Sequence, residues 1–137
     1  MTDEIDPKDR LLVVNEAFYA AFASGDLAWM TDIWSARSDI ACIHPGHATR
    51  FGRSAVLSSW FDILQQPPGV SFSGARVLIH GNIGLVFCEE HIGGHVLAVT
   101  NTFLLEGGRW RMVHHQASPV HAASPEQEPP ERGGTVH

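Results

Sequence analysis

Four strand-like stretches follow one another in the second half of the chain, and they constrain the fold more than any other feature. Each is rich in β-branched, aliphatic and aromatic residues, and short glycine-containing turns separate them, which is the pattern of consecutive β-hairpins. The stretches are 72–80, 83–91, 96–105 and 110–118, and the turns are Gly81-Asn82, Gly93-Gly94 and Gly107-Gly108. We therefore predict a meander of four antiparallel strands.

The first half of the chain has helical spacing instead. Asp6-Pro7 suits the cap and first position of a helix, and Gly25-Asp26 can end that helix and cap a second, short one. A third helix is predicted from Gly52 to Pro67-Pro68, after one short strand at 39–44. These elements predict an α+β domain, in which three helices pack on the concave face of a strongly curved, mostly antiparallel sheet.

Length, charge and cysteine content narrow the class of protein. The 137 residues suit one domain, which we assign to 1–123, followed by a Pro/Glu/Gly-rich tail at 124–137. The net charge of -6 and scattered basic residues argue against nucleic acid as a partner. No apolar run is long enough to span a bilayer, so no membrane association is expected. Cys42 and Cys88 lie in apolar runs, as buried thiols do, and a cytoplasmic protein is expected.

Several short motifs occur in an order that points to one family. They are Gly25-Asp26-Leu27, His44-Pro45-Gly46, Gly52-Arg53 and Trp110-x-x-Val113-His114-x-x-x-Ser118. Together they resemble the SnoaL-like branch of the superfamily of nuclear transport factor two and ketosteroid isomerase, over roughly Pro7 to Pro119. The resemblance implies a cone with a blind apolar pocket and a homodimer formed through the exposed sheet face.

The final strand is also similar to a second group. The association domain of calcium/calmodulin-dependent kinases ends on a Trp-x-x-Val-His-x-His-x-Ser pattern, in which the second histidine corresponds to Gln116 here. This similarity implies an alternative role as an oligomerising association module.

The isomerase branch implies positions for catalytic groups. Its general-base aspartate corresponds to His44 and its second oxyanion donor to Asn101, while its oxyanion tyrosine corresponds to Phe18, with Tyr19 adjacent. The resemblance therefore implies that the base and one donor are replaced, and that the other donor is lost. A steroid-isomerase mechanism does not carry over to such a site.

His44 and Asn101 each allow two interpretations from the residues themselves. His44 ends a strand, where an imidazole can face a pocket and take a proton from a carbon acid, or can hydrogen-bond the loop from Gly46 to Phe51 without any chemistry. Asn101 lies in an otherwise apolar strand, where its amide needs a hydrogen-bond partner. It can line the pocket or bond within the sheet.

Two adjacent histidines lie in the last strand, and the face of that strand that points inward decides which of them is internal. His114 and His115 point to opposite faces by strand alternation, so at most one lines the pocket. The register of the family favours the face that holds Val113, His115 and Ala117, and the alternative face holds Trp110, Met112, His114 and Gln116. A one-residue bulge would reverse this choice.

Glu90 is the candidate acid or base on the neighbouring strand. If Gly93-Gly94 forms the turn, Glu90 and Cys88 share a face with Asn101, and Glu90 lies near the rim of the cone. The alternative is a solvated carboxylate, or one paired with an arginine such as Arg111.

Metal and cofactor chemistry is not expected. His44 and His47 are close in sequence, and His91-x-x-x-His95 brackets a hairpin, but no spacing typical of a zinc site occurs. Trp34, Trp60 and Phe103 can wall a pocket, although aromatic residues at such spacings are more often core.

Three functional hypotheses remain. The first is a small-molecule-binding protein of undetermined activity, with an apolar pocket lined by Asn101, His115, Cys88, Trp34, Trp60 and Phe103. The second is an isomerase, cyclase or dehydratase that moves protons on an apolar carbonyl compound, with His44 or Glu90 as base and Asn101 holding the enolate oxygen. The third is the association module.

Overall fold

A computed structural model describes residues 5–121 of the chain. The tail expected at 124–137 and the two residues before it lie outside the described residues, as do residues 1–4. The elements are α1 (Pro7–Ser24), α2 (Leu27–Ile33), β1 (Ala41–Ile43), β2 (Arg50–Phe51), α3 (Arg53–Gln65), β3 (Val70–His80), β4 (Ile83–Ile92), β5 (His95–Glu106) and β6 (Arg109–Pro119).

The helix boundaries follow from local capping. The Asp6 side chain accepts a hydrogen bond from the Lys8 amide at 2.9 Å, and Pro7 is the first helical residue of α1. Gly25 closes α1 with φ 69°, a left-handed conformation that glycine adopts without strain. Asp26 then caps α2 by accepting from the Trp29 amide at 3.0 Å. The predicted starts of these helices are confirmed.

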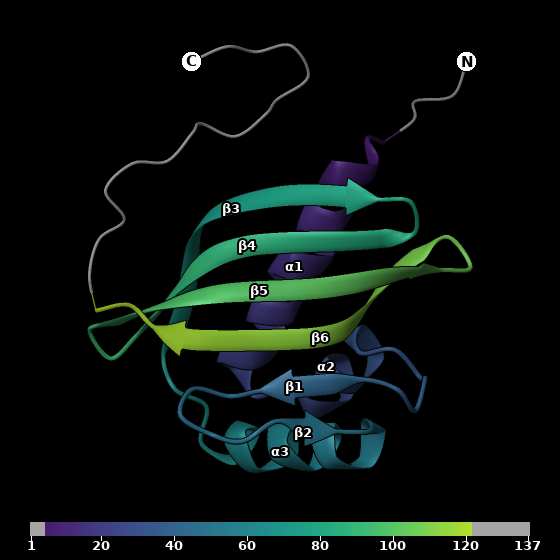
Figure 1. The fold of residues 1–137 in the computed structure, drawn as a ribbon. Helices are drawn as coiled ribbons and strands as arrows, with labels where there is room; N and C mark the ends of the chain where they lie inside the picture. The colour runs from purple at the N-terminus through teal and green to yellow at the C-terminus, as the bar shows by residue number, and fades with distance from the viewer. Residues whose placement is uncertain (1–4, 122–137) are drawn as a thin grey trace.

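The six strands form one curved, open sheet in the order β2-β1-β6-β5-β4-β3 (Figure 1). The predicted meander is confirmed, because β3 to β6 pair antiparallel in succession. β1 pairs parallel with β6, and the two-residue strand β2, which the sequence did not predict, pairs antiparallel with β1. The result is an α+β fold of three helices on a strongly curved, mostly antiparallel sheet.

The helices cover one face of this sheet. In Figure 1, α1 crosses behind β3, β4 and β5, and α2 and α3 lie at the edge formed by β1 and β2. Gly84 of β4 permits a close approach of α1, because an added Cβ would lie 2.5 Å from Leu11 Cδ2. The largest buried side chains of this layer include Phe18, Trp34, Trp60 and Phe103.

A bulge changes which residues of β6 face inward. Thr102 pairs with His114, whereas the next residue, Phe103, pairs with Met112, so Val113 is the extra residue. His115 and Ala117 are buried as expected, but Trp110 and Met112, which the sequence placed on the opposite face, are buried too. Simple alternation was therefore wrong for the first half of β6, since the bulge shifts the alternation by one residue.

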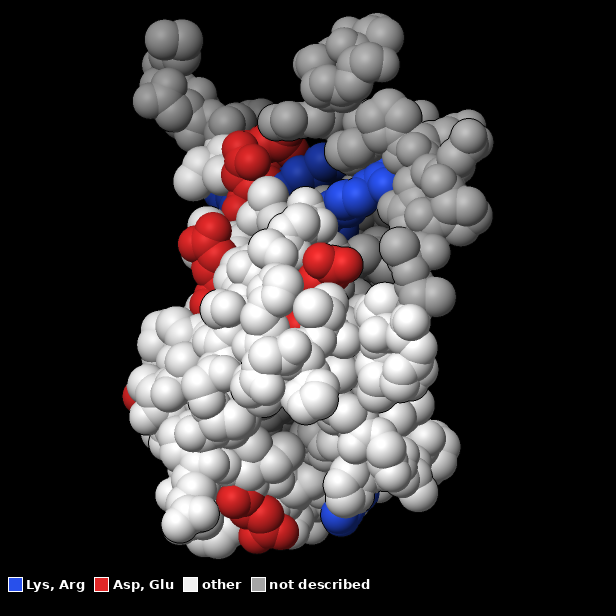
Figure 2. All heavy atoms as spheres, turned by 90° about the vertical axis from the view of Figure 1, so that its left-hand side faces the viewer, with Lys and Arg blue, Asp and Glu red and all other residues white. Residues whose placement is uncertain are grey.

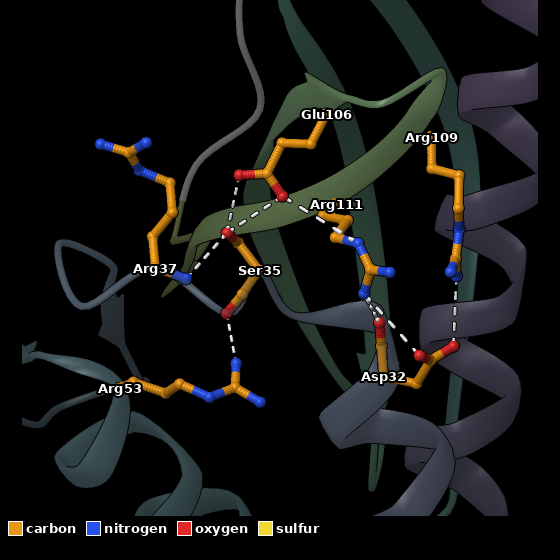
Figure 3. Close-up of polar contacts among 7 residues, drawn as sticks. All are labelled: Asp32, Ser35, Arg37, Arg53, Glu106, Arg109 and Arg111. Atoms are coloured by element: carbon orange, nitrogen blue, oxygen red, sulfur yellow. Dashed lines mark hydrogen bonds and ion pairs between the residues drawn. The ribbon is translucent and has the colours of Figure 1, made fainter.

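A group of charged and polar side chains ties the β5–β6 hairpin to the helices, and we call it the surface ion network (Figure 3). Asp32 contacts Arg109 at 3.2 Å and Arg111 at 3.7 Å, and the Ser35 hydroxyl donates to the Glu106 carboxylate at 2.9 Å. Its members are Asp32, Ser35, Arg37, Arg53, Glu106, Arg109 and Arg111.

Among the helices of residues 5–121, none combines the length and apolar character needed to cross a membrane.

Candidate functional site

Two cavities of about 240 Å³ each occur within residues 5–121, at different places in the fold. One lies between α1, α2 and the β5–β6 turn and is lined by Arg10, Val14, Ala17, Trp29, Asp32, Ile33, Gly108, Arg109 and Trp110. The other is lined by Phe22, His44, Pro45, His47, Ile63, Pro68, Glu90, Ile92 and His115. Only the second contains titratable residues that the sequence singled out, and we call it the histidine cavity.

The sheet topology brings three predicted residues into the histidine cavity. β1 pairs with β6 so that Cys42 lies beside His115, and His44 follows directly after β1. Asn101 of β5 pairs with His115, and β4 adds Glu90 from the next strand. The His44 and His115 ring centroids are 6.4 Å apart. Residues distant in sequence therefore meet in one hollow.

A chain of hydrogen bonds lies beneath the cavity, and we call it the buried polar network. Tyr19 Oη donates to Glu90 Oε2 at 2.6 Å. Asn101 Nδ2 donates to Asn15 Oδ1 at 2.8 Å and to Tyr19 Oη at 3.3 Å, and Asn101 Oδ1 lies 2.6 Å from His115 Nδ1. All five residues are buried, with at most 4% of any one exposed. These hydrogen bonds join helix α1 to strands β4, β5 and β6. They run between neutral side chains and the carboxyl group of Glu90.

Burial shifts the pKa values of His44, His115 and Glu90 in the directions that favour their neutral forms. Burial, together with smaller contributions from the nearby His44 and His114, lowers the pKa of His115 to about 3. Burial also lowers the pKa of His44 to about 4, with His47 and Arg50 acting in the same direction. The pKa of Glu90 is raised by burial, and the hydrogen bond from Tyr19 partly opposes this. The cavity therefore offers two neutral imidazoles next to a carboxyl group whose protonated form is favoured.

The side chain of His44 is held by α3 rather than by the following loop. Its Nε2 lies 2.8 Å from the Ser59 hydroxyl, and the ring packs edge-on against Trp60 with centroids 5.0 Å apart. The loop hydrogen bond that is present is between backbones, from the His47 amide to the His44 carbonyl at 3.0 Å. The imidazole thus has a fixed orientation at the cavity wall.

Glu90 does not lie at an exposed rim. The register that the sequence predicted is present, since Ile92 pairs with His95 and Glu90 with Leu97, but Glu90 is only 1% exposed. Curvature of the sheet carries this end of β4 over α1, where Tyr19 covers the carboxyl group. Pairing with Arg111 does not occur either, because Arg111 contacts Asp32 and Glu106.

The cysteines near the site remain thiols. Burial raises the pKa of Cys88 to about 11 and that of Cys42 to about 12. Cys88 Sγ lies 3.5 Å from Tyr19 Oη, so it adjoins the buried polar network. Neither thiol is activated as a nucleophile.

None of the three aromatic residues predicted to wall the pocket, Trp34, Trp60 and Phe103, is among the residues that line the histidine cavity. Trp60 packs against both histidine rings, at 5.0 Å from His44 and 5.7 Å from His115. Trp34 and Phe103 are fully buried in the core and do not line the histidine cavity. A ligand-binding role for these residues, as for Asn101 and Cys88, stays a prediction.

Sequence reasoning missed three partners of the site, Asn15, Tyr19 and Ser59. Tyr19, beside the position of the tyrosine implied by the family, donates its hydroxyl hydrogen to the Glu90 carboxyl group. Asn15 and Tyr19 are four residues apart and buried on one face of α1. Polar groups on an apolar helix face were the available signal, since such groups need internal partners.

The surface around this end of the molecule carries few charges. Figure 2 shows it from the side where β4 and β6 finish, and the central area around a shallow hollow is free of Lys, Arg, Asp and Glu. Glu90 is the only one of these four residue types that lines the histidine cavity. Within residues 5–121, no group of three or more His, Cys, Asp and Glu side chains is placed to hold a metal ion.

Comparison with solved structures gives the same fold. A proposed dehydratase of the NTF2-like family from Streptomyces avermitilis superposes with a TM-score of 0.76 and 28% identity, over 83% of this chain and 96% of that one. A proposed calcium/calmodulin-dependent protein kinase type II association domain from Thiobacillus denitrificans gives a TM-score of 0.74 and 25% identity, over 88% and 100% of the two chains.

A curated relative and a family model match as well. The chain is 27% identical to the F-box protein SKIP8 of Arabidopsis thaliana over 112 residues, 79% of this chain. It spans about half the length of that relative, since the match covers 48% of it. The model of the SnoaL-like domain matches residues 11–122. The chain therefore belongs to the SnoaL-like domain family.

Proposed function

We propose that this domain binds a small, largely apolar molecule in the histidine cavity. The observation that carries the proposal is the convergence of His44, Glu90 and His115 on one hollow of about 240 Å³ whose other walls are mainly apolar. Fixed polar groups at one wall can orient a ligand, while Phe22, Ile63 and Ile92 contribute apolar contact.

A thermal-shift screen of small aromatic alcohols and ketones tests this binding. Ligands that bind only the folded state should raise the melting temperature, and Ile63→Trp, which fills the cavity, should abolish the shift. Trp29→Ala, in the cavity beside α2, is the matched control and should leave the shift unchanged. A shift that survives Ile63→Trp but is lost in Trp29→Ala would move the binding site to the other cavity.

A second candidate function is acid/base catalysis, such as dehydration or isomerisation of a carbonyl compound. The buried polar network favours it, because one neutral imidazole and one carboxyl group with a raised pKa lie side by side, His115 Nε2 being 3.8 Å from Glu90 Oε2. In a dehydration, His115 would remove the proton next to the carbonyl, the carbon–carbon double bond would form, and the hydroxyl would leave as water with the proton from Glu90. The similarity to the proposed dehydratase supports this candidate.

Turnover of a chromogenic β-hydroxy ketone tests the catalytic candidate. 4-Hydroxy-4-phenylbutan-2-one gives a conjugated enone on loss of water, which is followed by its ultraviolet absorbance. We expect Glu90→Gln to lower the rate at least 100-fold, while Glu89→Gln, on the opposite face of the same strand, leaves it unchanged. Equal rates in the two variants would exclude Glu90 as the acid, and His44→Ala tests the other candidate base in the same assay.

We also propose a homodimer through the outer sheet face. Leu78 and Phe87 are 47% and 37% exposed there, and uncharged Thr100 lies opposite Phe87. Sedimentation should show a dimer that Phe87→Arg converts to a monomer. A wild-type monomer would contradict the proposal, and an assembly larger than a dimer would favour an association module, the role proposed for the similar domain from Thiobacillus denitrificans.

A further inference from the structure

The protonation of His115 follows from the hydrogen bonds around it. The Tyr19 hydroxyl has one hydrogen, which it donates to Glu90 Oε2 at 2.6 Å, so its oxygen is the acceptor for Asn101 Nδ2. This orientation of the amide turns Asn101 Oδ1 toward His115 Nδ1 at 2.6 Å. An amide oxygen only accepts, so His115 Nδ1 carries the hydrogen. In the neutral ring, Nε2 is therefore the unprotonated nitrogen.

The same reasoning applies to His44 on the other side. The Ser59 hydroxyl donates its hydrogen to the Val56 carbonyl at 2.6 Å. Its oxygen is therefore the acceptor for His44 Nε2 at 2.8 Å, and His44 carries its hydrogen on Nε2. Nδ1 is then the unprotonated nitrogen of this ring. Of the three histidines that line the cavity, His44 and His115 therefore each have one unprotonated ring nitrogen that can accept a hydrogen bond.

Glu90 completes the polar wall as a donor and acceptor. Its Oε2 is 3.8 Å from His115 Nε2, too far for a direct hydrogen bond. An oxygen atom between the two groups can lie about 2.8 Å from each, which is an ordinary hydrogen-bond distance. A hydroxyl group suits this position because it can donate to Nε2 and accept from the protonated carboxyl group.

Other functional groups fit less well. A carbonyl oxygen only accepts, so it would leave His115 Nε2 without a partner. A carboxylate or phosphate would face two imidazole acceptors, and no Lys or Arg lines the histidine cavity. On the basis of the binding function above, we propose that the histidine cavity selects uncharged molecules that carry a hydroxyl group, held between His115 and Glu90.

Four probes with one aromatic skeleton test this selectivity. They are 1-phenylethanol, acetophenone, 1-phenylethyl methyl ether and 2-phenylpropanoate, titrated at neutral pH by calorimetry. We expect the alcohol to bind at least tenfold more tightly than the ketone and the ether, and the carboxylate not to bind. Tighter or equal binding of the ketone, or binding of the carboxylate, would overturn the hydroxyl selectivity while leaving the binding function intact. Failure of all four probes would contradict both.

Variants and a spectroscopic measurement assign the selectivity to these atoms. His115→Gln should bring the alcohol and the ketone within about twofold of each other, whereas His114→Gln, one residue away on the part of β6 that does not line the cavity, should keep the tenfold preference. Nitrogen-15 spectra of the wild-type protein give a result that does not depend on the folding of any variant. We expect hydrogen on Nδ1 of His115 and on Nε2 of His44, and the reverse tautomer at His115 would overturn the assignment.

Discussion

The buried polar network and the surface ion network both join helices to the β5–β6 hairpin, but they do so under opposite conditions. In the surface ion network, Asp32 and Arg109 are 60% and 58% exposed (Figure 3). In the buried polar network, Asn101 is fully buried and its hydrogen-bond partners are almost so. The first relies on formal charges and the second mainly on neutral groups.

This difference decides what each network contributes. Exposed ion pairs are solvated and screened, and each contributes between zero and about 1 kcal/mol. A buried polar group that loses its partner costs about 1–3 kcal/mol, because water does not replace the lost bond. The buried hydrogen bonds also fix the tautomers, and burial shifts the pKa values on which the proposed site depends. We therefore expect substitutions in the buried polar network to have much larger effects than those in the surface ion network.

The largest effect is expected from Asn101→Leu. The substitution leaves His115 Nδ1 and Asn15 Oδ1 without their partners, so the free energy of unfolding should fall by about 4 kcal/mol. Urea denaturation measures this change, and Thr102→Val, at the next residue of β5 on the outer face, should change stability by less than about 1 kcal/mol. A loss below about 1 kcal/mol in Asn101→Leu would show that the two networks do not differ.

The pH dependence of stability is a second test of the difference between the buried polar network and the surface ion network. The pKa values of His44 and His115 are lowered to about 4 and about 3, so the unfolded state takes up their protons first as pH falls below about 6.5. The folded state keeps both imidazoles neutral, and the stability that depends on this is fully present above about pH 6.5. It is lost as the pH falls toward the folded pKa values. Each histidine contributes a slope of up to about 1.4 kcal/mol per pH unit.

Denaturation curves at pH 7, 6 and 5 measure this slope. His44→Gln should reduce it, whereas His47→Gln, on the same loop and more exposed, should not. The same curves for Glu90→Gln remove the opposing titration of Glu90. If the stability of this variant does not fall from pH 7 to pH 5, the assignment of two neutral buried histidines is contradicted.

Glu90 contributes with the opposite sign. Its raised pKa means that the folded protein keeps this proton when the unfolded chain, with a pKa near 4.3, has released it. The contribution of Glu90 to stability is therefore lost as pH rises through the folded pKa. Glu90→Gln should be more favourable, relative to wild type, at pH 8 than at pH 5, by about 1 kcal/mol or more. The exposed Glu89→Gln is the control, and an equal effect at both pH values would place Glu90 among the ordinary solvated carboxyl groups.

The features that the sequence predicted correctly are those encoded locally. Asp6 and Asp26 cap helices, and the Gly93-Gly94 turn sets the register that places Glu90 and Cys88 on the face of Asn101. Those signals act over a few residues, so they can be recognised without a structure. The inward position of His115 came from the register of the family, since strand alternation alone only places His114 and His115 on opposite faces.

The features that it missed depend on packing between distant segments. Strand β2 has two exposed residues and exists because β1 lies beside it. Nothing near Val113 marks the bulge, which accommodates both Trp110 and His115 in the interior. The burial of Glu90 requires Tyr19, 71 residues earlier in the chain. Such pairs form only when the sheet curves over α1, so the sequence alone does not predict them.

The smallest effect is expected from Asp32→Ala in the surface ion network. The substitution removes contacts to Arg109 at 3.2 Å and Arg111 at 3.7 Å, but Arg111 also donates to the Asp32 backbone carbonyl at 2.8 Å, and that bond remains. The free energy of unfolding should therefore fall by less than about 1 kcal/mol at low salt, and by less still in molar sodium chloride, because salt screens exposed charges. Asp62→Ala, an exposed acid of α3, controls for the change in net charge. A loss above about 2 kcal/mol that persists at high salt would mean that the surface ion network behaves like a buried one, and that exposure does not distinguish the two regions.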